Sequence, residues 1–151
     1  MRRERSRNMP EMKRILFMAG LAAVVCAFLF QPSALRAQGA IVAYPNLSPA
    51  EARDLLAKRS GDPGFVLLDV RTRKEFDAER IAGAVMVDYN SPSFRDEMAK
   101  LDRSKSYLVY CRTGNRTNGA VKVMRELGFP NVIVFPGGIT KWKEAGYPTA
   151  R

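Results

Sequence analysis

Three short apolar runs separated by helical patterns constrain the fold of this chain most strongly. The runs cover residues 65–70, 107–110 and 132–135. Apolar runs of this length suit strands that are covered on both faces, as in parallel sheets. Because helical segments separate the runs along the chain, the sequence predicts an α/β fold with a mainly parallel central sheet and helices on both faces.

Capping signals and apolar periodicity predict where the helices lie. Ser48 with Glu51, and Thr72 with Glu75, each match the capping-box pattern that begins a helix. Another helix is predicted to begin at Thr117, where apolar residues recur at helical spacing. These residues are Ala120, Val123, Met124 and Leu127. The remaining predicted elements are helices over residues 94–101 and 139–145 and a brief strand within residues 81–87.

The first 37 residues have the layout of a secretory signal. Six basic residues precede an uncharged apolar run of 16 residues, 15–30, which is shorter than the roughly 20 needed to span a bilayer. We expect cleavage near Ala37 or after Gly39 and export to the periplasm, with an uncleaved membrane anchor as the alternative. Residues 38–46 are then a lead-in, and residues 47–151 form one folded domain.

The positive charge of the chain does not indicate a nucleic-acid partner. The net charge is +10, but residues 38–151 hold 18 basic and 13 acidic residues, a net charge of +5. No stripe of Lys and Arg interleaved with aromatic residues occurs in the sequence, so we expect no nucleic acid as a partner. The remaining positive charge suits the attraction of small anions.

Two absences narrow the chemistry that the chain can perform. The sequence has no His, and Cys111 is the only Cys beyond the predicted signal. A nucleophile paired with His, a zinc site that includes His and an internal disulfide are therefore excluded. We expect no metal and no cofactor, and we expect a single thiol that is either buried and inert or free for chemistry.

The segment over residues 111–116 combines that thiol with features that favour negative charge. It consists of Cys111, Arg112, Thr113, Gly114, Asn115 and Arg116. It follows a predicted strand and precedes a helix, the place where sites form in parallel sheets. Free amides, a helix N-terminus and two guanidinium groups would lower the pKa of the thiol from about 8.5 to roughly 3.5–7.5. The alternative is a Cys111 that packs as a small core residue.

From about Leu47 to Pro148 the sequence resembles the rhodanese family. The matching segments are residues 47–48, 67–71, 75–76, 80–84, 111–116 and 137–138, Trp142 and residues 145–148. The resemblance implies a rhodanese-like domain over residues 47–151. Arg80 departs from the family pattern, in which His is frequent, and we expect Trp142 to be a core aromatic residue.

The resemblance also implies an activity, that of a thiosulfate sulfurtransferase. Cys111 would attack the outer sulfur of thiosulfate, release sulfite and hold a persulfide for transfer to cyanide or a thiol. The small anionic donor and the persulfide would be bound by the amides of Arg112, Thr113, Gly114, Asn115 and Arg116. In the family, the residues at Asp69 and Arg71 brace the loops beneath the site.

Three alternatives remain beside this interpretation. Cysteine phosphatases also wrap an anion in a loop after a strand, but five residues separate their Cys from their Arg, whereas four separate Cys111 from Arg116. A non-catalytic rhodanese-like module that binds a partner is the second alternative. The third is mercaptopyruvate as the sulfur donor, although positive charge at Arg112 and Arg116 favours the dianion thiosulfate.

Overall fold

The computed structural model describes residues 44–151 of the 151-residue chain. The predicted signal, its cleavage site and residues 38–43 of the lead-in lie outside the described residues. The described elements are α2 (Pro49–Lys58), β1 (Phe65–Asp69), α3 (Arg73–Ala78), β2 (Val85–Met86), α4 (Phe94–Ala99), β3 (Ser106–Tyr110), α5 (Asn115–Glu126), β4 (Val132–Phe135) and α6 (Gly138–Glu144). Among these helices, none has both the length and the apolar character needed to cross a membrane.

The strands of the described chain form one parallel sheet in the order β2-β1-β3-β4. β1 and β3 lie side by side in its centre, and Asp69 pairs with Tyr110 at their carboxyl ends. The predicted α/β fold with a mainly parallel sheet is confirmed. Because both central strands end at the same edge, the residues that follow Asp69 and Tyr110 are brought close together.

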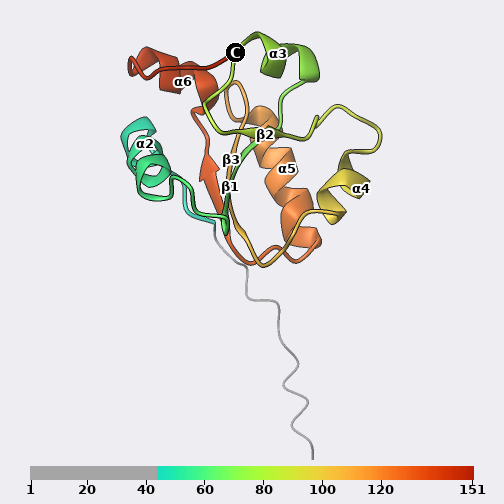
Figure 1. Cartoon of the computed structure of the whole chain (residues 1–151). Coiled ribbons are helices and arrows are strands. Elements are labelled where there is room, and N and C mark those ends of the chain that lie inside the picture. The colour runs from blue at the N-terminus through green and yellow to red at the C-terminus, as the bar shows by residue number, and fades with distance from the viewer. Residues whose placement is uncertain (1–43) are drawn as a thin grey trace, which may run out of the picture. The chain divides into compact units, whose positions relative to one another are not determined.

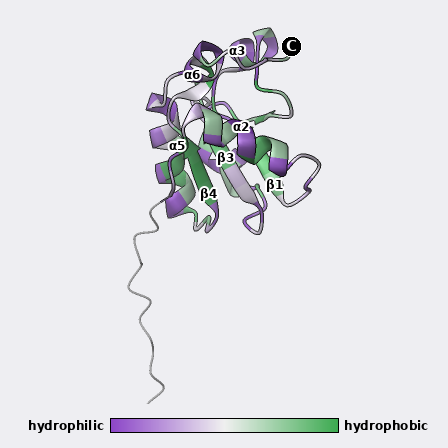
Figure 2. Ribbon diagram, turned by 90° about the vertical axis from the view of Figure 1, so that its left-hand side faces the viewer, coloured by the Kyte–Doolittle hydropathy of each residue, from purple (hydrophilic) through white to green (hydrophobic). Residues whose placement is uncertain are grey.

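The central strands contribute side chains alternately to two hydrophobic cores, one on each face of the sheet. Leu68 and Val109 belong to the core that α4 and α5 cover, and Leu67 and Leu108 to the core that α2 and α6 cover. Figure 1 shows these two pairs of helices on opposite sides of the sheet. Figure 2 shows β4 in the colour of hydrophobic residues, whereas the helices also carry hydrophilic ones. Burial on both faces therefore explains the continuous apolar runs.

Both predicted capping boxes are present. The Glu51 amide donates to the Ser48 hydroxyl at 3.4 Å, and the Glu51 carboxylate accepts from the Ser48 amide at 2.8 Å. The Thr72 hydroxyl and the Glu75 carboxylate cap α3 in the same way, at 3.3 and 3.1 Å. A cap of this kind stabilises a helix by about 1 kcal/mol, and the second one also fixes the place of Glu75 beside the site described below.

The helix that follows the Cys111 loop begins earlier than the sequence predicted. α5 starts at Asn115 rather than Thr117, because Gly114 adopts a left-handed conformation that turns the chain directly into the helix. Val123 and Leu127, predicted on the buried face, are only partly buried. The buried residues of α5 are Thr117, Ala120, Val121 and Met124. The prediction counted only apolar residues, so it did not place Thr117 on the buried face of the helix.

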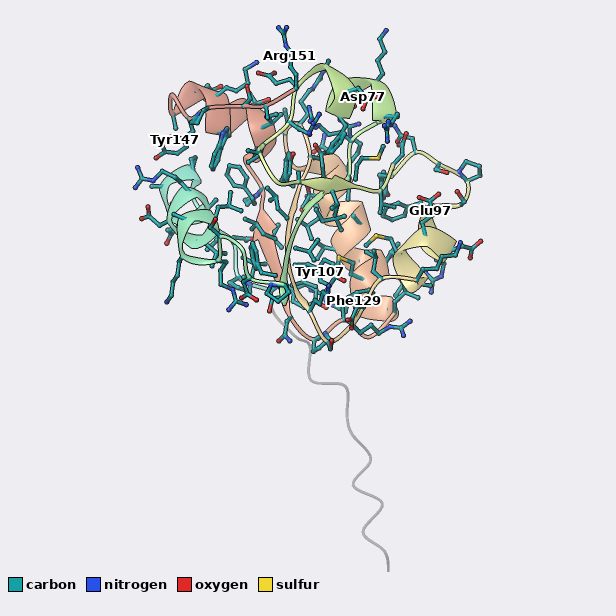
Figure 3. All side chains as sticks on the ribbon, in the orientation of Figure 1. Asp77, Glu97, Tyr107, Phe129, Tyr147 and Arg151 are labelled. Atoms are coloured by element: carbon teal, nitrogen blue, oxygen red, sulfur yellow. The ribbon has the colours of Figure 1, made fainter. Side chains whose placement is uncertain are left out.

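The carboxyl end of the sheet lies near α3, α6 and the C-terminal residues. An isolated antiparallel bridge joins Arg80 to Ala150 through two hydrogen bonds, of 2.9 and 2.8 Å. In Figure 3, Asp77 of α3 and Arg151 lie at one end of the domain, while Tyr107 at the start of β3 lies toward the other. β3 therefore runs toward the end that holds α3, and it leads there into Cys111.

Trp142 of α6 is a buried aromatic residue, as predicted. Its ring makes edge contacts with Phe135 and Tyr147, and its indole N–H donates to the Pro148 carbonyl at 2.8 Å. These contacts join α6 to the end of β4 and to the C-terminal segment. The position of the first turn of α6 is thereby fixed, and this turn contacts the Cys111 loop.

Candidate active site

Cys111 is the first residue after β3 and is 1% exposed. It lies at the base of a pocket of about 420 Å³ at the carboxyl end of the sheet. The pocket is lined by Thr72, Glu75, Asn90, Cys111, Arg112, Thr113, Asn115 and Arg116. The structure thus brings the predicted loop residues together around one cavity. The exception is Gly114, which is buried and does not line the pocket.

The first turn of α6 holds the carbonyl groups of the Cys111 loop away from the pocket. The Ile139 amide donates to the Cys111 carbonyl at 2.9 Å, and the Thr140 amide donates to the Arg112 carbonyl at 3.2 Å. In a trans peptide the N–H points opposite to the C=O, so the next amides along the loop face the other way. Only glycine fits at Gly138, because a Cβ there would lie 2.2 Å from the Cys111 carbonyl oxygen.

Gly114 closes the loop around the sulfur. Its amide nitrogen lies 3.1 Å from Cys111 Sγ and donates to it. Its φ of +99° is strained for any other residue, and a Cβ would lie 2.4 Å from the Pro136 carbonyl oxygen. Glycine is therefore required here both for the backbone conformation and for the close approach to the end of β4.

The surroundings of Cys111 stabilise its ionised form. Burial raises the pKa of the thiol, but the Thr117 hydroxyl and the amides of Thr117, Gly114 and Thr113 outweigh burial and lower the pKa below its ordinary value. The position at the N-terminus of α5 acts in the same direction. This arrangement favours a thiolate in a chain that has no His.

Thr117 is the residue of this site that the sequence analysis missed. It is fully buried in the first turn of α5, and its hydroxyl makes the leading contribution that lowers the pKa of Cys111. The signal was present in the sequence, because a hydroxyl residue six positions after the cysteine falls on the inner face of a helix that begins at Asn115. The prediction began that helix two residues later.

The two arginines of the loop differ in their surroundings. Arg116 makes a bidentate ion pair with Glu75, at 2.6 and 2.8 Å, and both side chains are partly buried. The Arg116 hydrogen bonds lower the pKa of Glu75 to about 2. Arg112 is exposed and forms no ion pair with the described residues. The groups that lead in lowering the pKa of the thiol are the Thr117 and loop donors rather than the two guanidinium groups.

Asp69 and Arg71 form a buried ion pair beside the loop. Their side chains are 0% and 4% exposed, and Arg71 Nη2 lies 2.7 Å from Asp69 Oδ2. Arg71 also donates to the Glu79 carbonyl at 2.6 Å, and its guanidinium lies over the Tyr110 ring. The pair therefore connects the ends of β1 and β3 to the end of α3, which is a bracing position.

A second pocket, of about 460 Å³, adjoins the first. Glu75 and Arg112 line both pockets. The other residues that line the second pocket are Arg71, Ala78, Glu79, Ile139, Thr140, Lys143 and Glu144. The pocket of Cys111 is therefore flanked by a groove between α3 and α6, and Glu75 and Arg112 line both.

A thiol at the end of a parallel strand, close to backbone amides at a helix N-terminus, is typical of the class of proteins that use a cysteine thiolate on small anions or sulfur. Comparison with known proteins narrows this class. Residues 50–145 match the family model described as "Rhodanese-like domain". The chain belongs to this family.

Relatives and solved structures agree with this assignment. The chain is 32% identical over 107 residues to the thiosulfate sulfurtransferase GlpE of Coxiella burnetii, covering 71% of this chain and 94% of GlpE. It is 29% identical over 125 residues to the probable adenylyltransferase/sulfurtransferase MoeZ of Mycobacterium tuberculosis, of which it spans only 29%. The rhodanese-related protein of Thermoplasma volcanium is 31% identical, with a TM-score of 0.59 over 71% of this chain and 98% of that one.

Sulfur transfer is supported for this chain at the level of the family. The relatives include proteins named as sulfurtransferases from bacteria and from Saccharomyces cerevisiae. A sulfur donor and a sulfur acceptor are therefore implied in general terms.

Proposed function

We propose that the chain is a sulfurtransferase that moves the outer sulfur of thiosulfate to cyanide or a thiol through a persulfide on Cys111. One observation carries this proposal: Cys111 lines a pocket, and its sulfur accepts a hydrogen bond from the Gly114 amide at 3.1 Å. The pKa of the thiol is lowered there. A thiolate is the form that attacks sulfur. A thiolate at a buried position must be stabilised by hydrogen-bond donors, such as the backbone amides of this loop.

Thiosulfate fits the charges of the pocket better than a larger donor does. Arg116 is already paired with Glu75, which leaves Arg112 as the cation on the pocket wall that is free to hold an anion. A small dianion can reach Arg112 and the loop amides at once. We therefore expect a higher kcat/KM with thiosulfate than with mercaptopyruvate. A higher kcat/KM with mercaptopyruvate would make mercaptopyruvate the proposed donor, and the persulfide on Cys111 would remain part of the mechanism.

The acceptor would approach Cys111 from the groove between α3 and α6. This second pocket shares Glu75 and Arg112 with the first, so it opens beside the place that the outer sulfur would occupy. Cyanide or a thiol that attacks this sulfur releases the Cys111 thiolate and completes the cycle.

The intact mass of the protein before and after thiosulfate treatment tests the proposal. The wild-type protein should gain one sulfur atom, located on Cys111 by peptide mapping, and cyanide should remove it as thiocyanate. Cys111→Ser is the matched control and should gain nothing. An unchanged wild-type mass with reduced Cys111 would favour the binding module. Release of phosphate from an aryl phosphate without thiocyanate formation would favour the phosphatase.

We also propose that the protein is exported and acts in the periplasm. The apolar run over residues 15–30, preceded by basic residues, supports this. Protein recovered from its native compartment should begin near residue 38 or 40 when its intact mass is measured. A mass that includes residues 15–30 would indicate the uncleaved membrane anchor instead.

A further inference from the structure

A buried hydroxyl without an ordinary partner lies in the candidate active site. Buried polar side-chain atoms in proteins nearly always form hydrogen bonds. Among the described residues, the exceptions are Thr117 Oγ1 and Arg59 Nε. Arg59 still pairs its guanidinium with Asp62 at 3.2 Å near the surface, whereas Thr117 is 0% exposed and no described nitrogen or oxygen satisfies its hydroxyl.

The group that Thr117 faces is the sulfur of Cys111. The hydroxyl forms no hydrogen bond in the described structure, yet it and the Thr117 amide lie near enough to the sulfur to lower the pKa of Cys111. The charged groups around the sulfur are Arg112 and Arg116 of the loop and Glu75 of α3, with the Asp69–Arg71 pair at the end of β1. Thr117 alone among the side chains around the thiol provides a neutral donor that is already buried and not committed to another acceptor.

We propose that the Thr117 hydroxyl is a catalytic group that stabilises Cys111 as the leaving thiolate when sulfur passes to the acceptor. The inference rests on the proposed sulfurtransferase function and assigns Thr117 to one of its two half-reactions. It is carried by a hydroxyl that is fully buried and without a hydrogen-bond partner in the first turn of α5, the helix that begins at the end of the Cys111 loop.

The charge on Cys111 differs between the two half-reactions. In loading, the Cys111 thiolate attacks the outer sulfur of thiosulfate, the S–S bond breaks, and sulfite leaves with the electron pair. In transfer, cyanide attacks the outer sulfur of the persulfide, the S–S bond breaks, and its electron pair returns to Cys111, which leaves as a thiolate while thiocyanate forms. The inner sulfur of the persulfide is neutral, so the hydroxyl binds it weakly and binds the departing thiolate strongly.

Replacement of Thr117 by Val should therefore affect the half-reactions unequally. Transfer to cyanide should slow about tenfold to a hundredfold, the size expected for a lost hydrogen bond to a charged group. The rate of loading, measured above the pKa of the thiol, should not fall. The attacking thiolate has lost a stabilising hydrogen bond and is therefore no weaker as a nucleophile. The valine removes an unsatisfied buried hydroxyl, so resistance to unfolding should be unchanged or increased, which a purely structural role for Thr117 would not produce.

The experiment measures the two half-reactions by rapid mixing. Sulfite release after addition of thiosulfate reports loading, and thiocyanate formation after addition of cyanide to the isolated persulfide form reports transfer. Thr117→Ser, which keeps the hydroxyl, is the matched control and should transfer sulfur within a fewfold of wild type. Thr117→Ala provides the same comparison should the valine variant not fold.

Equal slowing of both steps in Thr117→Val, or a serine variant as slow as the valine variant, would overturn the role of Thr117. A wild-type protein that takes up no sulfur would instead overturn the proposed function. Transfer at the wild-type rate in a Thr117→Val protein that loads normally would overturn only this inference.

Discussion

The loops after β1 and β3 leave the same edge of the sheet from neighbouring strands, but they use their polar groups in opposite ways. After β1, Arg71 is enclosed by the Asp69 carboxylate and the Glu79 carbonyl, so every strong charge is matched within the protein. After β3, the loop turns its carbonyls toward α6 and its donors toward the sulfur of Cys111. We call the first the closed loop, because its buried charges pair with each other, and the second the open loop, because its donors converge on a sulfur that lines a pocket.

The fold thus places a stabilising ion pair in the loop after β1 and the reactive thiol in the loop after β3. A matched buried pair holds the strand ends in register and connects them to α3. A loop whose donors converge on one atom, with glycine at its closest contacts, leaves that atom able to bind an anion. Variants that disturb one loop or the other should therefore have different consequences for stability and for the thiol.

Asp69→Asn breaks the closed loop. The Arg71 cation would remain buried without a counter-charge, which costs about 3–5 kcal/mol. The expected result at neutral pH is a large fall in the free energy of unfolding, measured with urea. Asp54→Asn is the control, because Asp54 pairs with Arg53 on the surface, where both side chains are more than half exposed. The control should change stability by less than about 1 kcal/mol, and equal losses in the two variants would contradict the account.

Gly114→Ala breaks the open loop. The added Cβ would meet the Pro136 carbonyl oxygen and the residue would be held at positive φ, which together cost about 3 kcal/mol. Because the hydrogen bond from the Gly114 amide would lengthen, the pKa of Cys111 should also rise, as measured by the pH dependence of its alkylation. Gly61→Ala has a similar positive φ of +75° but open space around the Cβ. That control should cost about 1 kcal/mol and leave the thiol unchanged.

Glu75→Gln tests the ion pair that connects α3 to the open loop. The pKa of Glu75 is lowered from 4.5 to about 2, so the stabilisation from its charge is fully present above about pH 4.5 and is lost as the pH falls through about 2. Wild type should therefore exceed Glu75→Gln in stability by about 2 kcal/mol at pH 6, since the pair is partly exposed. The gap should shrink toward pH 2. A gap that does not change with pH would show that the pair contributes nothing through charge.

The sequence predicted most of the fold and part of the site. Apolar runs and capping boxes depend on neighbours in the chain, so the strands, α2 and α3 could be located from pattern alone. The partners of Arg116 and Arg71 could not, because Glu75 lies 41 residues from Arg116 and the Glu79 carbonyl belongs to the backbone. Thr117 was missed for a different reason: its signal lay in the local sequence, but the prediction began α5 two residues too late to place Thr117 on the inner face of the helix.

The central property of the open loop is that it favours ionisation of the Cys111 thiol. The pH dependence of Cys111 alkylation measures this ionisation directly. In a Cys26→Ser background Cys111 is the only thiol of the chain, so the rate with a neutral alkylating reagent reports its thiolate alone. The account predicts a midpoint clearly below the ordinary thiol value of about 8.5. A midpoint at or above that value, or a thiol that the reagent does not reach, would contradict it.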